Sequence, residues 1–231
     1  MKIRTSGRDF WVQSKGVELP GLELVAYLLA EHRWMEMADP DRQVKPGDVV
    51  LDCGAHVGIF TDTALRRSAA KVIAFEIHPV NLECLRRNFA KEIAENRVIV
   101  VAKGVWSSES TMDFAFSREN SGMGSLILKS PGSTTIPVPL TRIGTALAEL
   151  QIPRVDFIKM DIEGAEREAL AGATRTLRQF KPALALDAYH LPDDAVVLPR
   201  VILTANPAYK ESCGPCERFH DVYRPHVLYY R

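Results

Sequence analysis

The segment that most constrains the fold of this chain is VVLDCGAHVGIF, which runs from Val49 to Phe60. An apolar run ends in Asp52, a glycine turn follows, and a second apolar run ends in another acid, Glu76. This pattern is typical of a nucleotide-binding βαβ unit, in which glycines let a ligand approach the backbone and the second acid binds a ribose. The turn reads Asp-x-Gly-x-x-x-Gly and not the Gly-x-Gly-x-x-Gly of a dinucleotide site, so we expect a ligand with a ribose but no diphosphate.

Strand and helix patterns then alternate along the chain. Apolar runs predict main-sheet strands at 49–52, 71–76, 97–102, 155–160 and 183–187. Helical spacing predicts helices at 58–67, from Pro79 onward and at 165–179. This alternation predicts an α/β fold with a doubly wound, mostly parallel sheet.

A different pattern interrupts this alternation after residue 105. Apolar residues recur with period two at 112–116 and 136–140, which predicts a small antiparallel β insertion. Pro137 and Pro139 place the later strand at an edge, because proline donates no ladder hydrogen bond. We also expect short strands at 201–204 and 227–230 near the C-terminus.

The length of 231 residues predicts a single domain covering 1–231. Within it we expect an N-terminal helical segment at 1–47, a cofactor-binding core at 48–190, and C-terminal strands and a loop at 191–231. The N-terminal segment contains a short strand at 10–12 and a helix with Leu22, Val25 and Leu28 on one face. Whether two chains pair through this helix is left open by the sequence.

Charge and hydropathy exclude several classes of protein. The 29 basic and 29 acidic residues give no net charge, which disfavours nucleic acid as the main partner. Neither a signal peptide nor an apolar run of the roughly 20 residues that a membrane helix needs is present, so we expect a cytoplasmic protein without a membrane partner. Cys53 and Cys84 fall within core patterns and are predicted to be buried thiols.

Acidic side chains end four of the expected strands. They are Asp52, Glu76, Asp161 and Asp187, and the turn 102–105 follows a further strand. Ligands of an open parallel sheet bind beyond the carboxyl ends of its strands. Isolated charges at a sheet rim cost desolvation, so this grouping indicates a functional site.

Four segments of the chain resemble a known family. They are VVLDCGAHVGIF, AFEIHPVNLECLRRNF, DFIKMDIEGAE and ALDAYH. Together they resemble the FkbM family of S-adenosylmethionine-dependent methyltransferases over roughly residues 45 to 190. The resemblance implies a class I, Rossmann-like methyltransferase fold, and S-adenosylmethionine as the cofactor with S-adenosylhomocysteine as the product. It also implies O-methylation of a small molecule or a sugar hydroxyl.

The resemblance also implies roles for matching residues in cofactor binding. The turn under the methionine part would consist of Asp52, Gly54, Ala55 and Gly58. Glu76 would bind both ribose hydroxyls, Ile77 would pack against the adenine, and Gly104 and Val105 would approach the adenine's other face. His56 stands where such proteins commonly have Asn. Apart from any ligand, Gly54 and Gly58 also suit a tight strand-to-helix turn.

Three residues beyond the strand ends are candidates for the chemistry. Transfer to a hydroxyl requires removal of its proton, and we predict that His190 or Asp161 is the base and that Glu163 positions the acceptor. The alternatives are a helix-cap or loop histidine at 190 and a helix-capping acid at 163. Lys159, inside an apolar strand, is predicted to be an ion-pair partner or an edge residue. Asp161, Glu163, Asp187 and His190 could together bind Mg²⁺, but we do not expect a metal.

Several alternatives remain. Cys213 and Cys216 suggest a redox motif, or a zinc site together with His220 and His226, but position and spacing favour a surface loop. A nucleic-acid methyltransferase, a nicotinamide oxidoreductase and a non-catalytic module that binds S-adenosylmethionine are the rival functions. Loop 117–125 and the C-terminal region are predicted to shape the acceptor pocket.

Overall fold

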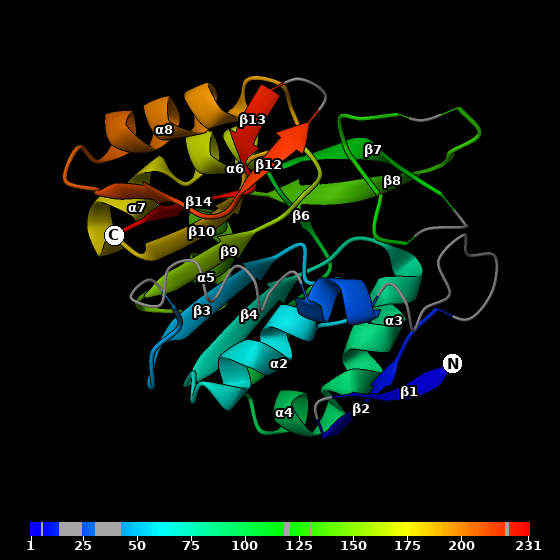
Figure 1. Ribbon diagram of the computed structural model, residues 1–231. Coiled ribbons are helices and arrows are strands. Elements are labelled where there is room, and N and C mark those ends of the chain that lie inside the picture. The colour runs from blue at the N-terminus through cyan, green and yellow to red at the C-terminus, as the bar shows by residue number, and fades with distance from the viewer. Residues whose placement is uncertain (6, 14–24, 31–42, 118–120, 130, 220–221) are drawn as a thin grey trace.

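A seven-stranded sheet forms the centre of the structure, in the order β11-β14-β10-β9-β3-β4-β5 (Figure 1). Parallel pairing joins β3 (Val49–Cys53), β4 (Lys71–Phe75), β5 (Val98–Val101), β9 (Phe157–Met160) and β10 (Ala183–Asp187). Antiparallel pairing adds β14 (Val227–Tyr230) beside β10, and β11 (Glu211–Cys213) beside β14. The predicted mostly parallel sheet is confirmed.

This computed structural model describes residues 1–5, 7–13, 25–30, 43–117, 121–129, 131–219 and 222–231. Three predicted features lie outside these ranges: Leu22, residues 118–120 of the expected loop, and His220. Val25 and Leu28 do fall in a helical stretch.

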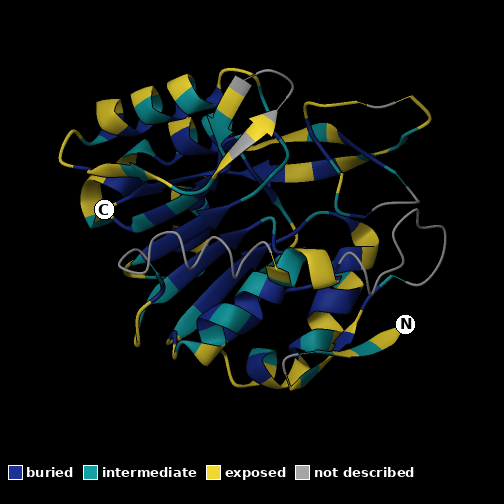
Figure 2. Cartoon of the chain, viewed as in Figure 1, coloured by how far each residue is buried: buried dark blue, intermediate teal, exposed yellow. Residues whose placement is uncertain are grey.

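Helices cover both faces of the sheet, which the burial pattern explains (Figure 2). One face carries α2 (Ile59–Arg66), α3 (Pro79–Asn88) and α4 (Ala90–Ala94); the other carries α5 (Ile143–Glu149), α6 (Glu166–Gly172), α7 (Thr174–Phe180) and α8 (Asp194–Ala205). Neighbouring strand residues point to opposite faces, so Val50 packs with the first layer and Leu51 with the second. Strands buried on both faces are continuous apolar runs, as the sequence shows.

The chain order reverses between β3 and β9, which lie side by side at the centre of the sheet. From β3 the chain continues to β4 and β5 on one side, and it returns to β9 and β10 on the other. In sheets of this kind the ligand crevice opens at this reversal, outside the carboxyl ends of the strands.

A small three-stranded sheet extends beyond this crevice. It consists of β6 (Gly104–Val105), β8 (Thr134–Thr141) and β7 (Ser110–Phe116), with β8 in the middle. The predicted antiparallel insertion is therefore present. The edge position predicted for 136–140 is wrong at Leu140, which pairs with β6, whereas β6 does not pair with residues 136–139. Pro137 and Pro139 pair only with β7, where β6 does not reach, so their missing donors cost no ladder bond there.

Two hairpins complete the described strands. They are β1 (Lys2–Thr5) with β2 (Arg8–Trp11), and β12 (Cys216–Phe219) with β13 (Val222–Pro225). Cys213 and Cys216 are exposed free thiols, whereas Cys53 and Cys84 are buried as predicted. Among the described residues, no helix is both long and apolar enough to span a bilayer.

Two predicted elements differ from the structure. Residues 201–204 belong to α8, where Leu198, Ile202 and Ala205 are buried at helical spacing; the prediction of a strand there is wrong because a four-residue apolar run does not distinguish the two states. The helix predicted at 165–179 is divided into α6 and α7. The division follows Gly172, where a Cβ would lie 2.3 Å from the carbonyl oxygen of Trp106.

Candidate functional site

The glycine turn after β3 is fixed to the ends of two neighbouring strands. The N–H groups of Gly54 and Ala55 donate to the carbonyl oxygen of Phe75 at 3.1 and 2.9 Å. Gly54 has φ +79°, and a Cβ there would lie 1.8 Å from the carbonyl oxygen of Asp161, at the end of β9. Only glycine therefore lets the ends of β3, β4 and β9 converge.

A cavity that is open to solvent lies beside this turn. Its lining includes five of the residues predicted to bind the cofactor, namely Gly54, Glu76, Ile77, Gly104 and Val105, together with Asp161 and Glu163. Segment 121–126, between β7 and β8, closes one side of it. The structure thus brings the predicted ribose carboxylate and two of the predicted catalytic acids to one cavity.

Three residues predicted to bind the cofactor, Asp52, Ala55 and Gly58, do not line the cavity. Asp52 is fully buried beneath it, where it accepts a hydrogen bond from Thr61 Oγ1 at 2.7 Å. Gly58 caps α2 at φ +95°, and a Cβ there would lie 2.2 Å from the Phe89 ring. Asp52 and Gly58 therefore contact residues behind the cavity lining and do not contact the cavity itself.

Backbone donors hold the Glu76 carboxylate in the cavity wall. Its Oε1 accepts from the N–H groups of Ile77 and His78 and its Oε2 from that of His56, each at 2.7 Å. Burial raises the pKa of Glu76 to about 7, and these three donors oppose the rise. The carboxylate is held rigidly and retains lone pairs for a ligand hydroxyl.

Buried polar atoms without a partner among the described residues also belong to cavity-lining side chains. They are His56 Nδ1, His78 Nε2 and Asn81 Oδ1. Burial lowers the pKa of both His56 and His78 to about 4, so both imidazoles are neutral at pH 7. Buried polar atoms are normally satisfied, so this grouping fits a cavity that receives a polar ligand.

Segment 121–128 is fastened over the cavity by two serines. Ser121 Oγ lies 3.1 Å from His56 Nε2, and its carbonyl oxygen accepts from Asn81 Nδ2 at 2.9 Å. Ser125 Oγ donates to the carbonyl oxygen of Glu163 at 2.6 Å and accepts from the N–H groups of Ile127 and Leu128 at 3.0 and 2.9 Å. The antiparallel insertion is thereby connected to the backbone of Glu163.

Removal of the Ser125 hydroxyl is expected to loosen this segment. Ser125→Ala leaves two N–H groups and one carbonyl without their partner, so we expect a loss of about 1–2 kcal/mol in the free energy of unfolding. Urea denaturation measures the loss, and hydrogen exchange at 123–128 locates it. Ser110→Ala, at an exposed position on β7, is the control. A Ser125→Ala protein as stable as the wild type would contradict the assigned fastening role.

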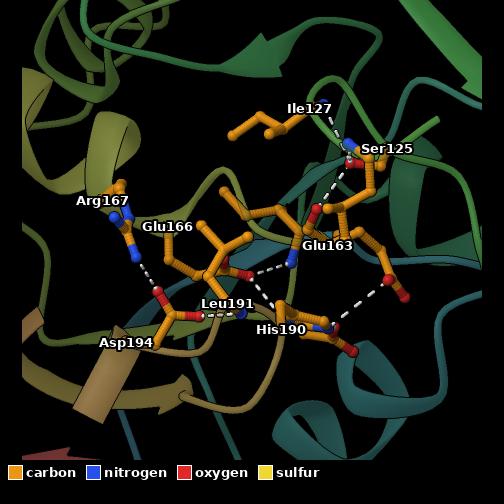
Figure 3. A network of polar contacts seen from close by, with 12 residues as sticks. Ser125, Ile127, Glu163, Glu166, Arg167, His190, Leu191 and Asp194 are labelled. Atoms are coloured by element: carbon orange, nitrogen blue, oxygen red, sulfur yellow. Dashed lines mark hydrogen bonds and ion pairs between the residues drawn. The ribbon is translucent and has the colours of Figure 1, made fainter. Parts of the chain in front are cut away.

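A cluster of charged side chains forms the opposite side of the site (Figure 3). His190 Nε2 lies 3.5 Å from Asp161 Oδ1 and 3.6 Å from Glu163 Oε2. On the other side of the ring, Nδ1 lies 3.1 Å from Glu166 Oε1, which also accepts from the Ile162 N–H at 2.8 Å. The structure therefore brings together all three residues predicted to be catalytic.

The backbone on both sides of this cluster is held in place. Glu163 has φ +54°, a conformation that costs energy for a residue with a Cβ and often marks a functional site. After His190, the Leu191 N–H donates to Asp194 Oδ2 at 2.7 Å, and Asp194 pairs with Arg167 of α6 at 2.7 Å. The ends of β9 and β10 are thus locked together by α6 and α8.

Burial and mutual proximity set the charges of the cluster. Burial disfavours the imidazolium of His190, but the carboxylates of Glu166, Asp161 and Glu163 outweigh burial and raise its pKa to about 10. Burial raises the pKa of Glu163 to about 7, and the charge of His190 opposes that rise. Without other cations, the cluster therefore holds protons tightly.

Lys159 and Glu166 also belong to the site. The sequence predicted a structural role for Lys159 and gave no prediction for Glu166. Lys159 is buried and lies 3.8 Å from Asp52 and 3.5 Å from Asp161, as the ion-pair prediction required, and it donates to the carbonyl oxygen of Gly54 at 3.1 Å. Burial disfavours its charge, but Asp161 and Asp52 outweigh burial and raise its pKa. Glu166 is fully buried in the first turn of α6. The one available signal for Glu166 was its place at the end of DIEGAE.

Comparison with known proteins identifies a family. The profile described as "Methyltransferase FkbM domain" matches residues 52–221. The hexuronic acid methyltransferase AglP of Haloferax volcanii is 31% identical, over 59% of this chain and 54% of that protein. The 31-O-demethyl-FK506 methyltransferase FkbM of Streptomyces tacrolimicus is 27% identical, over 56% of this chain and 61% of that protein. This chain therefore spans between half and two thirds of the length of these relatives.

A solved structure agrees with this assignment at the level of the fold. The crystal structure of methyltransferase FkbM from Methylobacillus flagellatus KT superposes with a TM-score of 0.60 at 24% identity, over 82% of this chain and 44% of that chain. It shares the Rossmann-like architecture described above. Since the family profile covers most of the sequence, from the end of β3 through the cluster around His190, this chain belongs to the FkbM methyltransferase domain family.

Proposed function

We propose that this protein binds S-adenosylmethionine in the cavity beside Glu76 and transfers its methyl group to a hydroxyl of a small molecule or a sugar. One observation carries the proposal. A single cavity has a hydroxyl-binding carboxylate, Glu76, in its wall and the carboxylates of Asp161 and Glu163 in the same lining. The first suits a ribose, and the second pair suits a hydroxyl that must lose a proton.

The residues present fit this cofactor. Glu76 would accept hydrogen bonds from the ribose hydroxyls, and the apolar side chains of Ile77 and Val105 would pack against the adenine. His56 and His78 each have a ring nitrogen without a hydrogen-bond partner among the described residues, which polar groups of the ligand could reach. A Cβ on Gly104 would lie 2.6 Å from Leu140, so the wall beside the adenine position is already closely packed.

The chemistry requires alignment and proton removal. When bound, S-adenosylmethionine would supply an electrophilic methyl group on a positively charged sulfur, and the carbon–sulfur electron pair would stay on the sulfur as the acceptor oxygen bonded to the methyl carbon. The chain therefore has to hold the acceptor in line, exclude water and take up the hydroxyl proton.

Glu163 is the residue to which we assign contact with the acceptor hydroxyl. It lines the cavity, its backbone is fixed by Ser125, and its Oε2 faces His190. His190 is almost completely buried and does not line the cavity, so we assign it a positioning role within the cluster. The assignment differs from the expectation that His190 or Asp161 is the base and that Glu163 only positions the acceptor.

The names of two relatives support an acceptor that is a small molecule or a sugar. One relative acts on a hexuronic acid, which is a sugar acid, and the other on a 31-O-demethyl compound, in which an oxygen lacks its methyl group. The acceptor of this chain is proposed to belong to the same chemical class.

Calorimetric titration tests the cofactor. We expect S-adenosylmethionine to bind and NAD not to bind, and Glu76→Ala to weaken binding by about 1–3 kcal/mol, the cost of removing a charged hydrogen-bond partner. Glu83→Ala, an exposed acid on α3 that pairs with Arg87, is the matched control and should bind like the wild type. Binding of NAD, or equal affinity in Glu76→Ala, would refute the proposal.

Radiolabelled methyl transfer to a panel of sugars, other hydroxyl compounds and RNA then separates the rivals. Transfer to a hydroxyl compound supports the proposal. Transfer to RNA alone would favour a nucleic-acid methyltransferase. Cofactor binding that survives loss of Asp161, Glu163 and His190, with no transfer to any acceptor, would favour a non-catalytic binding module.

A further inference from the structure

We propose that Asp161, Glu163 and His190 form a binding site for one divalent transition-metal cation, for which Mn²⁺ serves as the probe. Among the described residues, these three place one donor atom each within 4.8 Å of one another. Cation binding does not require the cofactor, whereas the catalytic role of the cation rests on the function proposed above. From the sequence we expected no metal and considered Asp187 as a fourth ligand; Asp187 is not part of this group.

The spacing of the donor atoms suits a small cation. His190 Nε2 lies 3.5 Å from Asp161 Oδ1 and 3.6 Å from Glu163 Oε2. Neighbouring ligand atoms around an octahedral ion with bonds of about 2.1 Å are about 3 Å apart, so shifts of a few tenths of an ångström would bring His190 Nε2 to this distance from both carboxylates.

The orientation of His190 is the second, independent observation. Its side chain is only 3% exposed, and its Nε2, which faces the two carboxylates, makes no hydrogen bond to a described residue. Nδ1 faces the Glu166 carboxylate on the other side of the ring. Metal-binding histidines almost always direct the second ring nitrogen to a carboxylate or carbonyl, which fixes the ring and makes the ligating nitrogen more basic.

Charge balance favours a cation at this point. Around β9 the described residues hold more acids than bases: Lys159 and His190 face the carboxylates of Asp52, Asp161, Glu163, Glu166 and Asp187. A divalent cation at this point would reduce the excess of negative charge.

The donor set distinguishes among metals. Two carboxylates and one imidazole are mixed oxygen and nitrogen ligands, which suit a divalent first-row transition metal such as Mn²⁺ better than Ca²⁺ or Mg²⁺, ions that prefer oxygen alone. Three protein ligands leave positions open for water and for the acceptor hydroxyl. A bound cation would lower the pKa of that hydroxyl, whose proton passes to the free carboxylate oxygen of Glu163 as the oxygen–methyl bond forms.

The test is titration of Mn²⁺ into the tag-free, EDTA-treated full chain. Calorimetry and electron paramagnetic resonance detect the binding. We expect one Mn²⁺ per chain. We also expect Asp161→Asn and His190→Gln to weaken binding by about 10-fold or more, the scale seen when metal sites lose a supporting group. Glu168→Gln, at an acid of α6 that accepts a hydrogen bond from Ser107 and is not one of the three proposed ligands, is the control and should bind like the wild type.

A spectroscopic readout makes the result independent of how well the variants fold. Pulsed electron paramagnetic resonance of Mn²⁺ bound to the wild type should show coupling to an imidazole nitrogen, and His190→Gln should abolish it. Absence of Mn²⁺ binding at millimolar concentration, or binding without nitrogen coupling, would overturn the proposal. Cofactor titration of the same metal-free sample separates the two proposals. If S-adenosylmethionine binds and Mn²⁺ does not, only the metal site is refuted. If Mn²⁺ binds and S-adenosylmethionine does not, only the methyltransferase function is refuted.

Discussion

Replacement of Glu163 by Gln is expected to lower kcat for methyl transfer by about 10²–10⁴-fold, the usual contribution of a positioned acid or base. Gln keeps the size and most of the hydrogen bonding of Glu but cannot take up a proton or hold a cation with the same charge. The Ser125 hydroxyl bonds to the backbone carbonyl of residue 163, so the loop geometry should survive the substitution. Affinity for S-adenosylmethionine should stay at the wild-type level, because Glu76 is unaffected.

Single-turnover transfer of a labelled methyl group measures this effect without interference from product release. A fall in kcat without a matching rise in KM locates the role of Glu163 in the transition state. Glu168→Gln should retain full activity, and calorimetry with S-adenosylmethionine shows that both variants are folded. If Glu163→Gln keeps more than about a tenth of the wild-type kcat, Glu163 is not the residue that handles the proton.

The main sheet could be predicted from the sequence because its strands are buried on both faces. Such strands are short continuous apolar runs, and those at 49–52, 71–76, 155–160 and 183–187 all end in or before an acid. Parallel strands carry these ends to the same edge, so the strand pattern alone predicts that Glu76, Asp161 and Glu163 lie near one another. For these strands and their terminal acids, the local sequence pattern is sufficient for the prediction.

Helix boundaries and the α8 region were harder to predict, since tertiary contacts decide them. Nothing near 172 in the sequence indicates that the chain must approach the backbone of Trp106, and this approach accompanies the division between α6 and α7. Pro199 inside α8 disfavours a helix, yet burial of Leu198 and Ile202 on one face outweighs its missing donor.

Within the site, the sequence predicts which strand ends carry acids but not which way each side chain points. Asp52 turns beneath the cavity to Thr61 and Lys159, whereas Glu76 remains in the cavity wall. The position of Glu166 behind His190 depends on how α6 packs against the end of β10, which is a long-range contact. Local patterns contain no information of that kind.

Gly54→Ala is expected to have the largest effect on stability, about 2–5 kcal/mol in the free energy of unfolding. Two costs add. The left-handed backbone at φ +79° costs a residue with a Cβ about 1–2 kcal/mol, and forced overpacking costs typically about 1–3 kcal/mol. The contact is with the backbone carbonyl of Asp161, at 1.8 Å, which cannot move away as a flexible side chain could.

Gly47→Ala separates the two costs, because it has the same kind of backbone without the contact. Its φ is +86°, and no atom of the described residues lies within 4 Å of the position that a Cβ would occupy. Its free energy of unfolding should fall only by the backbone cost of about 1–2 kcal/mol. The difference between the two variants in urea denaturation therefore measures the close approach of β3 to the end of β9.

A shift of the Asp161 carbonyl also moves the Asp161 and Glu163 carboxylates, so Gly54→Ala should lose methyl transfer while Gly47→Ala keeps it. Equal stability of the two variants would mean that the ends of β3 and β9 can separate without cost, and the convergence on which the site depends would then be loose.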